Sequence, residues 1–176
     1  MIDFLSRLIR FFEQYNIPYM LSGSVALSIY TMPRHTKDFD FVVHLNAGDA
    51  AIVAAYFKDG YYCDEDAVNE AIRYKSMFNI IDFQSGYKAD FIVLKNEKYR
   101  QEEFLRRKQV DFMDMKIYVV SVEDLLISKI IWIQQLQSDI QKEDIKELSK
   151  TKTLDWAYVN NWVSSLKLNT FGLIKQ

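Results

Sequence analysis

The chain has 176 residues, of which 49% are hydrophobic and 26% are charged, a balance typical of a globular protein and not of a disordered one. Its 22 basic and 24 acidic residues leave a net charge of −2, which excludes a general electrostatic attraction to nucleic acid. The single cysteine excludes an internal disulfide and cannot by itself form a zinc site.

The N-terminal segment is interrupted by charged residues and lacks the continuous apolar run of a signal peptide. No other stretch is long and apolar enough to span a bilayer. The sequence therefore predicts a cytoplasmic protein with no membrane partner.

Apolar residues near the N-terminus recur at helical spacing and predict a helix over about residues 3–15. The sequence Asn16-Ile17-Pro18 ends this helix, because proline cannot continue it. We then expect a short strand over residues 19–21, a turn over 22–24 and a helix over 25–30.

The rest of the chain predicts further strands and helices. We expect a strand over 38–45, a helix containing Ala51 and Phe57, a hairpin of strands over about 77–83 and 88–94, a charged helix or extended loop over 97–108, a strand over 115–120, helices over about 121–137 and 140–150, and a last helix containing Trp156. This order predicts an α+β fold with one mixed sheet and packed helices. Residues 1–120 are expected to form the core, and residues 121–176 a helical part packed on it as a single globular unit.

Two aspartates alternate with phenylalanines in the sequence Asp38-Phe39-Asp40-Phe41. In a strand, residues i and i+2 face the same side, so both carboxylates would point together. Like charges side by side are unfavourable, and a bound divalent cation such as magnesium would relieve them. The alternative is a strand with one wet face on which both aspartates are solvated.

The turn Ser22-Gly23-Ser24 lies between a strand and a helix. Such a junction presents backbone N–H groups at a helix N-terminus, where phosphate binds readily. Glycine would let the backbone approach a ligand closely. The alternative is an ordinary serine N-cap with a glycine turn.

A third carboxylate is expected at Asp90, which lies in an otherwise apolar run, because an aspartate there is costly unless it is paired or bound to metal. Asp82 competes for this role, but it lies beside the hairpin turn, where an aspartate is common. Lys88 falls on the same face as Asp90 and could pair with it or with a phosphate.

Lys129 falls inside the apolar stripe of the helix over 121–137, where a lysine seldom lies without a partner. It could bind a triphosphate, contact Asp144 or extend to the surface. Asp144 also borders an apolar face of its helix. A basic cluster is expected on a solvated helix face and consists of Lys95, Lys98, Arg100, Arg106, Arg107 and Lys108.

The order of Gly23-Ser24, Arg34, Thr36, Asp38 and Asp40 resembles the signature of the polymerase-beta-like nucleotidyltransferases. The spacing of the last four, together with Glu123-Asp124-Leu125, Lys129 and Asp144-Ile145, is similar to the small bacterial branch that includes abortive-infection nucleotidyltransferase toxins. The resemblance implies a nucleotidyltransferase core with magnesium or manganese bound by Asp38, Asp40 and Asp90. The nucleoside triphosphate would be bound by Ser22, Gly23, Ser24, Arg34, Thr36, Lys88, Lys129 and Asp144.

The expected reaction is transfer of a nucleoside monophosphate from a triphosphate to a hydroxyl, with release of pyrophosphate. Asp90 would lie nearest the acceptor hydroxyl and help to deprotonate it. The acceptor stays open between RNA, protein and a small molecule such as an aminoglycoside, and the resemblance to toxins adds a cognate antitoxin as a partner. The alternative function is a non-catalytic nucleotide-binding or antitoxin-like module on the same fold.

Overall fold

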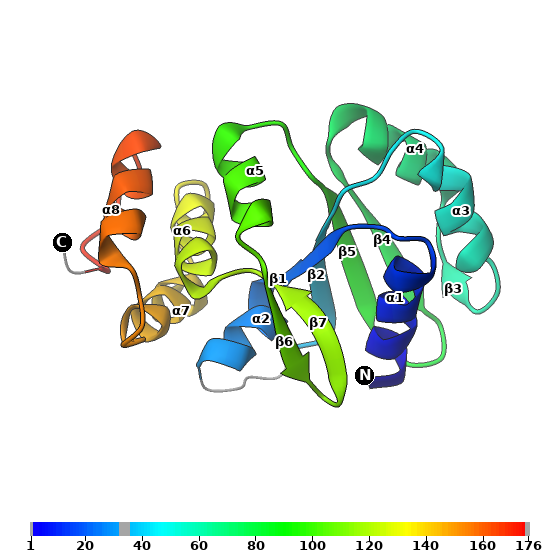
Figure 1. Ribbon diagram of the computed structural model, residues 1–176, viewed down its shortest axis with the longest axis horizontal. Helices are drawn as coiled ribbons and strands as arrows, with labels where there is room; N and C mark the ends of the chain where they lie inside the picture. The colour runs from blue at the N-terminus through cyan, green and yellow to red at the C-terminus, as the bar shows by residue number, and fades with distance from the viewer. Residues whose placement is uncertain (1, 32–35, 175–176) are drawn as a thin grey trace.

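The computed structural model describes residues 2–31 and 36–174. Within them, seven strands form one mixed sheet in the order β3-β4-β5-β2-β1-β7-β6. Helices pack on the sheet and gather at both of its ends (Figure 1). The expected α+β class with a mixed sheet is therefore confirmed.

The helices are α1 (Ile2–Gln14), α2 (Gly23–Tyr30), α3 (Asp49–Tyr56), α4 (Glu65–Tyr74), α5 (Lys98–Leu105), α6 (Val122–Ile133), α7 (Asp139–Ser149) and α8 (Trp156–Ser165). The strands are β1 (Tyr19–Ser22), β2 (Asp38–Val43), β3 (Tyr61–Tyr62), β4 (Met77–Asp82), β5 (Lys88–Val93), β6 (Lys108–Phe112) and β7 (Met115–Val119). Among the described residues, none of these helices is both long and apolar enough to cross a membrane.

One face of the sheet packs on α1 through aromatic side chains. The ring of Phe12 lies 5.1 Å from that of Phe41 on β2 and 5.4 Å from that of Phe91 on β5, and all three residues are buried. Aromatic pairs at such separations add stability beyond the area they bury. Because Phe41 alternates with its neighbours along β2, this packing directs Asp40 to the opposite face.

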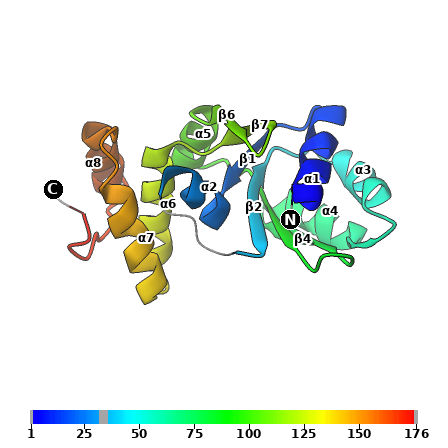
Figure 2. The same cartoon turned by 90° about the horizontal axis from the view of Figure 1, so that it is seen from below.

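The opposite face of the sheet is covered in part by α2, which packs on β1 and β2, and α6 in turn packs on α2. Residues 121–130, which contain most of α6, are all buried, because α7 and α8 cover its other sides. Figure 2 shows α6, α7 and α8 on one side of β1 and β2, with α1, α3 and α4 on the other. The helical C-terminal segment therefore lies against the face that carries the aspartates.

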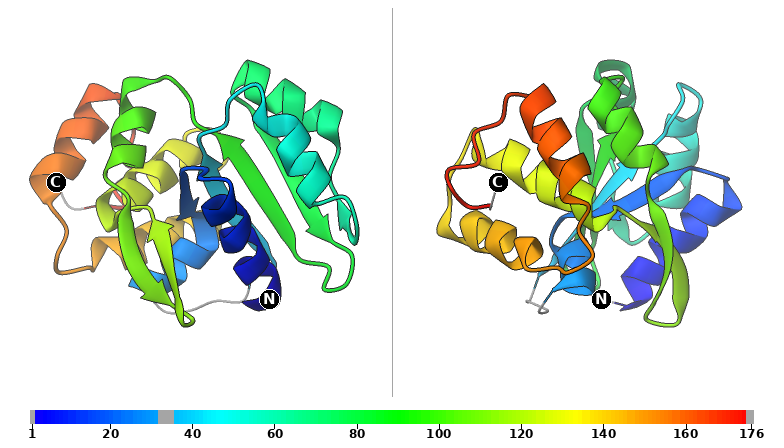
Figure 3. Two further views of the ribbon diagram at one scale, coloured as in Figure 1. Left: turned by 45° about the vertical axis from the view of Figure 1, so that its right-hand side comes forward. Right: turned by 60° about the vertical axis from the view of Figure 1, so that its left-hand side comes forward.

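The sequence did not predict β3, α4 or β6. Helix α4 was missed because its buried residues are few and lie among charges, although Asp64 caps it by accepting hydrogen bonds from the N–H groups of Asp66 and Ala67. Strand β6 has no buried residue and is defined by pairing with β7, with which it forms a protruding hairpin (Figure 3). The turn residues Met113 and Asp114 both have positive φ, as tight hairpins require.

Candidate active site

A row of polar side chains crosses four neighbouring strands of the sheet. Ser22 on β1 is in register with Asp40 on β2, and Asp40 is in register with Asp90 on the parallel strand β5. Asp90 is in turn opposite Asn79 on β4, whose Nδ2 donates a hydrogen bond of 3.1 Å to Asp90 Oδ1. Residues in register on adjacent strands share a face, so this row brings the two aspartates together.

The turn between β1 and α2 lies directly against Asp40. Gly23 has a φ of +63°, and a Cβ built on it would lie 1.8 Å from Oδ2 of Asp40. The backbone N–H of Ser24 donates a hydrogen bond to Asp40, which favours the charged carboxylate. The turn expected over residues 22–24 is not a separate element, because Ser22 ends β1 and Gly23 already begins α2. Ser22 precedes α2 without a side-chain capping bond.

The carboxylates have only partial charge compensation. Burial raises the pKa of Asp40, and the negative charge of Asp90 raises it further, while Lys129 opposes the shift. Lys88 Nζ lies 2.8 Å from Oδ2 of Asp90 and 3.9 Å from Oδ1 of Asp38. The hydrogen bond to Asp90 raises the pKa of Lys88. Of the two partners that the sequence left open for Lys88, the structure shows Asp90.

Lys129 on α6 points to Asp144 on α7. Its Nζ donates a hydrogen bond of 2.8 Å to Asp144 Oδ2, and the two side chains are 8% and 7% exposed. A buried lysine requires such a partner, because an unpaired ammonium in an apolar environment is very costly. Of the alternatives that the sequence left open for Lys129, the structure shows the contact with Asp144 and no extension to the surface.

A pocket of about 370 Å³ opens beside the polar row. At one end it is lined by Ser22, Gly23, Asp40, Asp90 and Lys129. The rest of its lining is mainly apolar and includes Val42, Met77, Ile92, Leu94, Leu125 and Trp132. Ligand pockets commonly combine an apolar lining with a few placed polar groups.

Other expected residues lie around this pocket and not in its wall. Asp38 and Lys88 begin β2 and β5, next to the polar row. Thr36 Oγ1 accepts a hydrogen bond of 3.3 Å from the N–H of Asp38 and so supports the start of β2. Asp144 reaches the site through Lys129. Arg34 lies outside the described residues.

Asp82, the competitor for the third carboxylate, belongs to the β4–β5 turn. Its carboxylate accepts hydrogen bonds from Ser85 Oγ and from the N–H of Gln84. Burial alone does not separate the candidates, since Asp82 and Asp90 are each 8% exposed. The positions of the two residues separate them, because Asp90 is in register with Asp40 and lines the pocket.

Several residues in or beside the pocket were not predicted. Asn79, which is not in the pocket lining, orients Asp90 through its hydrogen bond, and a group formed by Arg100, Glu103 and Ser128 lines another part of the pocket. Glu103 is 2% exposed, so the solvated face expected for the basic cluster is wrong at Arg100, which pairs with it at 2.7 Å. No local pattern marks these partners, because Ser128 lies 25 residues from Glu103 along the chain.

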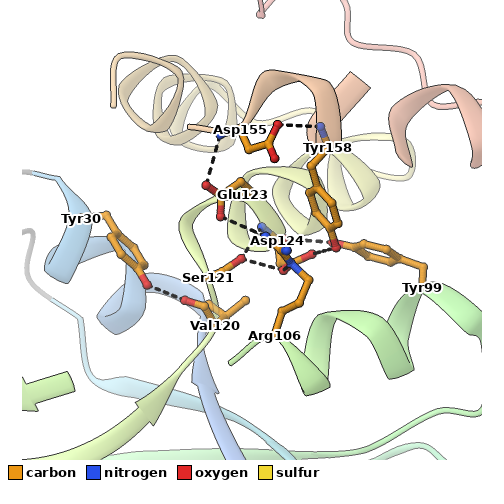
Figure 4. Close-up of polar contacts among 9 residues, drawn as sticks. All are labelled: Tyr30, Tyr99, Arg106, Val120, Ser121, Glu123, Asp124, Asp155 and Tyr158. Carbon is orange, nitrogen blue, oxygen red and sulfur yellow. Dashed lines mark hydrogen bonds and ion pairs between the residues drawn. The ribbon is translucent and has the colours of Figure 1, made fainter. Parts of the chain in front are cut away.

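Helix α6, which carries Lys129, is held at its N-terminus by a buried carboxylate (Figure 4). Asp124 accepts hydrogen bonds from Ser121 Oγ at 2.6 Å, from Arg106 Nε at 3.0 Å and from Tyr158 Oη at 2.7 Å. The guanidinium of Arg106 also lies over the ring of Tyr158, 3.8 Å from its centroid. This network ties the end of α5 and α8 to the start of α6, and Arg106 is therefore not on a solvated face either.

The architecture of the chain aligns with that of several solved structures. The chain has the nucleotidyltransferase fold. ANT(2'')-Ia in complex with adenylyl-2''-tobramycin aligns with a TM-score of 0.64 at 11% identity, over 94% of this chain and 96% of that one. The lincomycin-bound lincosamide antibiotic adenylyltransferase LnuA aligns with a TM-score of 0.59 at 16% identity, over 84% of this chain and 96% of that one.

A third structure with this fold is an antigenic nucleotidyltransferase-like protein from Paracoccidioides brasiliensis. It aligns with a TM-score of 0.52 at 16% identity, over 92% of this chain and 84% of that one. No protein-family model matches the sequence, and no curated protein sequence does. The similarity therefore concerns the nucleotidyltransferase fold.

Proposed function

We propose that the protein is a nucleotidyltransferase that moves a nucleoside monophosphate from a nucleoside triphosphate to a hydroxyl acceptor. One observation carries this proposal: Asp40 and Asp90 lie in register on adjacent strands, and the pocket they line also contains the Gly23 turn. A pair of carboxylates beside a backbone turn at a helix N-terminus suits a metal-bound triphosphate. The shared fold of the adenylyltransferase LnuA supports the same reaction class.

The residues present fit a divalent metal ion in their chemistry. Asp38, Asp40 and Asp90 offer only carboxylate oxygens, which magnesium and manganese prefer. In residues 2–31 and 36–174, no three acidic, histidine or cysteine side chains are already grouped to hold a metal. Lys88 lies between Asp90 and Asp38, so metal binding would draw the carboxylates together at the expense of this ion pair. When bound, the metal supplies charge neutralisation for the phosphates.

The chain's own groups position the reactants. The Gly23 turn and the first N–H groups of α2 face the phosphates, and Lys129 adds positive charge at the same end of the pocket. The acceptor oxygen attacks the α-phosphorus, the bond to the β-phosphate oxygen breaks, and pyrophosphate leaves. Asp90, held by Asn79 and Lys88, accepts the proton from the acceptor hydroxyl.

The acceptor is proposed to be RNA, a protein or a small molecule. Two proteins of this fold are described with small molecules, lincomycin for LnuA and adenylyl-2''-tobramycin for ANT(2'')-Ia. The motif resemblance to abortive-infection toxins instead suggests a macromolecular acceptor, a cytoplasmic setting and a cognate antitoxin. Both kinds of acceptor fit the same reaction, because the same site residues would act on the triphosphate in either case.

Labelled triphosphates test the proposal directly. The protein would be incubated with each α-labelled ribonucleoside triphosphate, with magnesium or manganese, and in turn with total tRNA, lincomycin or tobramycin. We expect label transfer to one acceptor, loss of at least about a hundredfold in rate for Asp90→Asn, and little loss for Asp82→Asn, a control with equal burial in the same hairpin. Metal-dependent nucleotide binding without any transfer would favour the non-catalytic module.

A further inference from the structure

The wall of the pocket contains a buried polar group formed by Arg100 and Glu103 of α5 and Ser128 of α6. Ser128 Oγ donates to Glu103 Oε1 at 2.5 Å, and Arg100 Nη1 lies 2.7 Å from both Glu103 Oε2 and Ser128 Oγ. Glu103 is 2% exposed. Burying an ion pair seldom adds net stability, so such a group in a pocket wall indicates a functional role.

The guanidinium of Arg100 is fixed in place but only partly used. Its hydrogen bonds to Glu103 and Ser128 occupy both hydrogens of Nη1, and the ring of Tyr99 lies 5.3 Å from its Cζ. Within the described part of the chain, Nε and Nη2 have no hydrogen-bond partner, and neither is a fully buried atom. These two nitrogens form the side of the guanidinium that can bind two adjacent acceptors.

The pocket connects this guanidinium to the proposed triphosphate site. One cavity of about 370 Å³ is lined by Gly23, Lys129 and Arg100. Its lining also includes the apolar residues Ile92 and Leu94, which follow Asp90 along the chain toward α5 and Arg100. This volume is near the lower limit of about 300 Å³ for ligand pockets and suits a single small ligand. If the phosphates lie at the Gly23 end, the apolar part of the pocket receives the base.

We propose that Arg100 binds the nucleobase and selects a base that carries a carbonyl oxygen, which disfavours adenine. This inference rests on the proposed function. A carbonyl oxygen accepts from the free N–H groups of Arg100, and guanine offers the further acceptor N7 beside O6. Adenine instead presents its N6 amino group, a donor, at the equivalent position, so two donors would face each other. Glu103 and Ser128 orient Arg100 for this contact.

Two purines of nearly equal size provide the sharpest test, because ITP and ATP differ mainly in the group at position 6. Dissociation constants with magnesium would be measured for ITP, ATP, GTP, CTP, UTP and inorganic tripolyphosphate. We expect ITP to bind at least about tenfold more tightly than ATP, since a good bidentate contact discriminates by roughly that factor or more. In Arg100→Gln, whose side-chain amide can accept from an amino group as well as donate to a carbonyl, the ITP and ATP constants should agree within about threefold.

Arg107→Gln is the matched control, because Arg107 follows the same helix but does not line the pocket. It should keep the wild-type preference for ITP. The proposal is overturned if wild-type protein binds ATP as tightly as ITP, or if Arg100→Gln retains the preference. Binding of tripolyphosphate with equal binding of all nucleotides would overturn the base selection but leave the proposed function intact. Absence of binding by tripolyphosphate and by every nucleotide would overturn both.

Discussion

The backbone of Gly23 lies in direct contact with the carboxylate of Asp40. A Cβ on Gly23 would lie 1.8 Å from Oδ2 of Asp40 and 2.5 Å from its Cγ, distances at which no side chain can be accommodated without movement. The φ of +63° at Gly23 independently favours glycine. The turn that would hold phosphates and the strand that would hold metal are therefore fitted to each other at a single residue pair.

Gly23→Ala is expected to damage both stability and nucleotide binding. The left-handed backbone costs about 1–2 kcal/mol for a non-glycine residue, and the added methyl group displaces the Asp40 carboxylate. In a chain of this size, that cost lowers the melting midpoint by about 2–8 °C. Calorimetry with and without a magnesium triphosphate would measure the loss of midpoint and the loss of ligand-induced stabilisation.

Gly60→Ala separates the two effects. Gly60 has a φ of +84°, but a Cβ there would meet nothing within 4 Å. The variant should show a similar backbone cost and keep the full stabilisation by nucleotide. Equal loss of nucleotide binding in both variants would contradict the role assigned to the Gly23–Asp40 contact.

Asp40→Asn is expected to be more stable than the wild type at neutral pH. Burial and the charge of Asp90 raise the pKa of Asp40, so the folded state binds this proton more tightly than the unfolded state does. The folded wild-type protein therefore has its full stability at pH values below the ordinary carboxyl pKa. It loses stability as the pH rises through the raised pKa of Asp40. Melting midpoints measured without metal from about pH 4 to about pH 8 should show the advantage of the variant growing with pH.

Asp38→Asn serves as the control for this charge effect. The side chain of Asp38 is 54% exposed, so water solvates its charge and its removal should change the midpoint less. An Asp40→Asn protein that is less stable than the wild type at neutral pH would contradict this expectation. It would show that the charged carboxylate of Asp40 stabilises the folded protein.

Local patterns were sufficient for much of the site. The alternation around Asp38 and Asp40 predicted their common face, and the hairpin turn predicted the antiparallel pairing of β4 with β5. The parallel pairing of β2 with β5 could not be read from either strand, because residues from 44 to 87 separate them. Register across such a distance depends on packing in the complete fold, and it is this register that joins Asp40 to Asp90.

Charged residues at buried positions were harder to predict from the sequence. A lysine in an apolar stripe was conspicuous at Lys129, whereas Arg100 and Glu103 lie in a helix whose composition suggests a solvated face. Helix α6 covers these two side chains, and Ser128 of α6 forms hydrogen bonds with both of them. Sequence reasoning therefore found the polar groups that interrupt an apolar pattern and missed those that a distant helix covers.

The pair Lys129–Asp144 is expected to behave as a buried unit. Removal of one partner, in Lys129→Met or Asp144→Asn, should destabilise the protein by about 3–5 kcal/mol, because the remaining group loses its partner in the interior. The double variant should lose less than the sum of the two. Urea unfolding of the four proteins would give the coupling free energy of the pair.

The surface pair Asp139–Lys142 on α7 gives the comparison for this cycle. Its side chains are 102% and 35% exposed, and the nearest atoms are 3.7 Å apart. Exposed pairs of this kind contribute about 0.2–1 kcal/mol, so the same cycle there should yield a coupling within that range. A coupling for Lys129–Asp144 as small as that of the surface pair would contradict its buried, paired state.

Tyr158→Phe tests the network that holds the start of α6. Tyr158 Oη donates to the carboxylate of Asp124 at 2.7 Å, and its loss should cost about 1.5–3 kcal/mol, the range for hydrogen bonds to charged groups. Tyr30→Phe is the control, because Tyr30 Oη donates over the same 2.7 Å to the neutral carbonyl of Val120 and should cost about 0.5–1.5 kcal/mol. Urea unfolding of both variants measures the difference, and an equal loss in both would show that the charge of Asp124 does not strengthen the network.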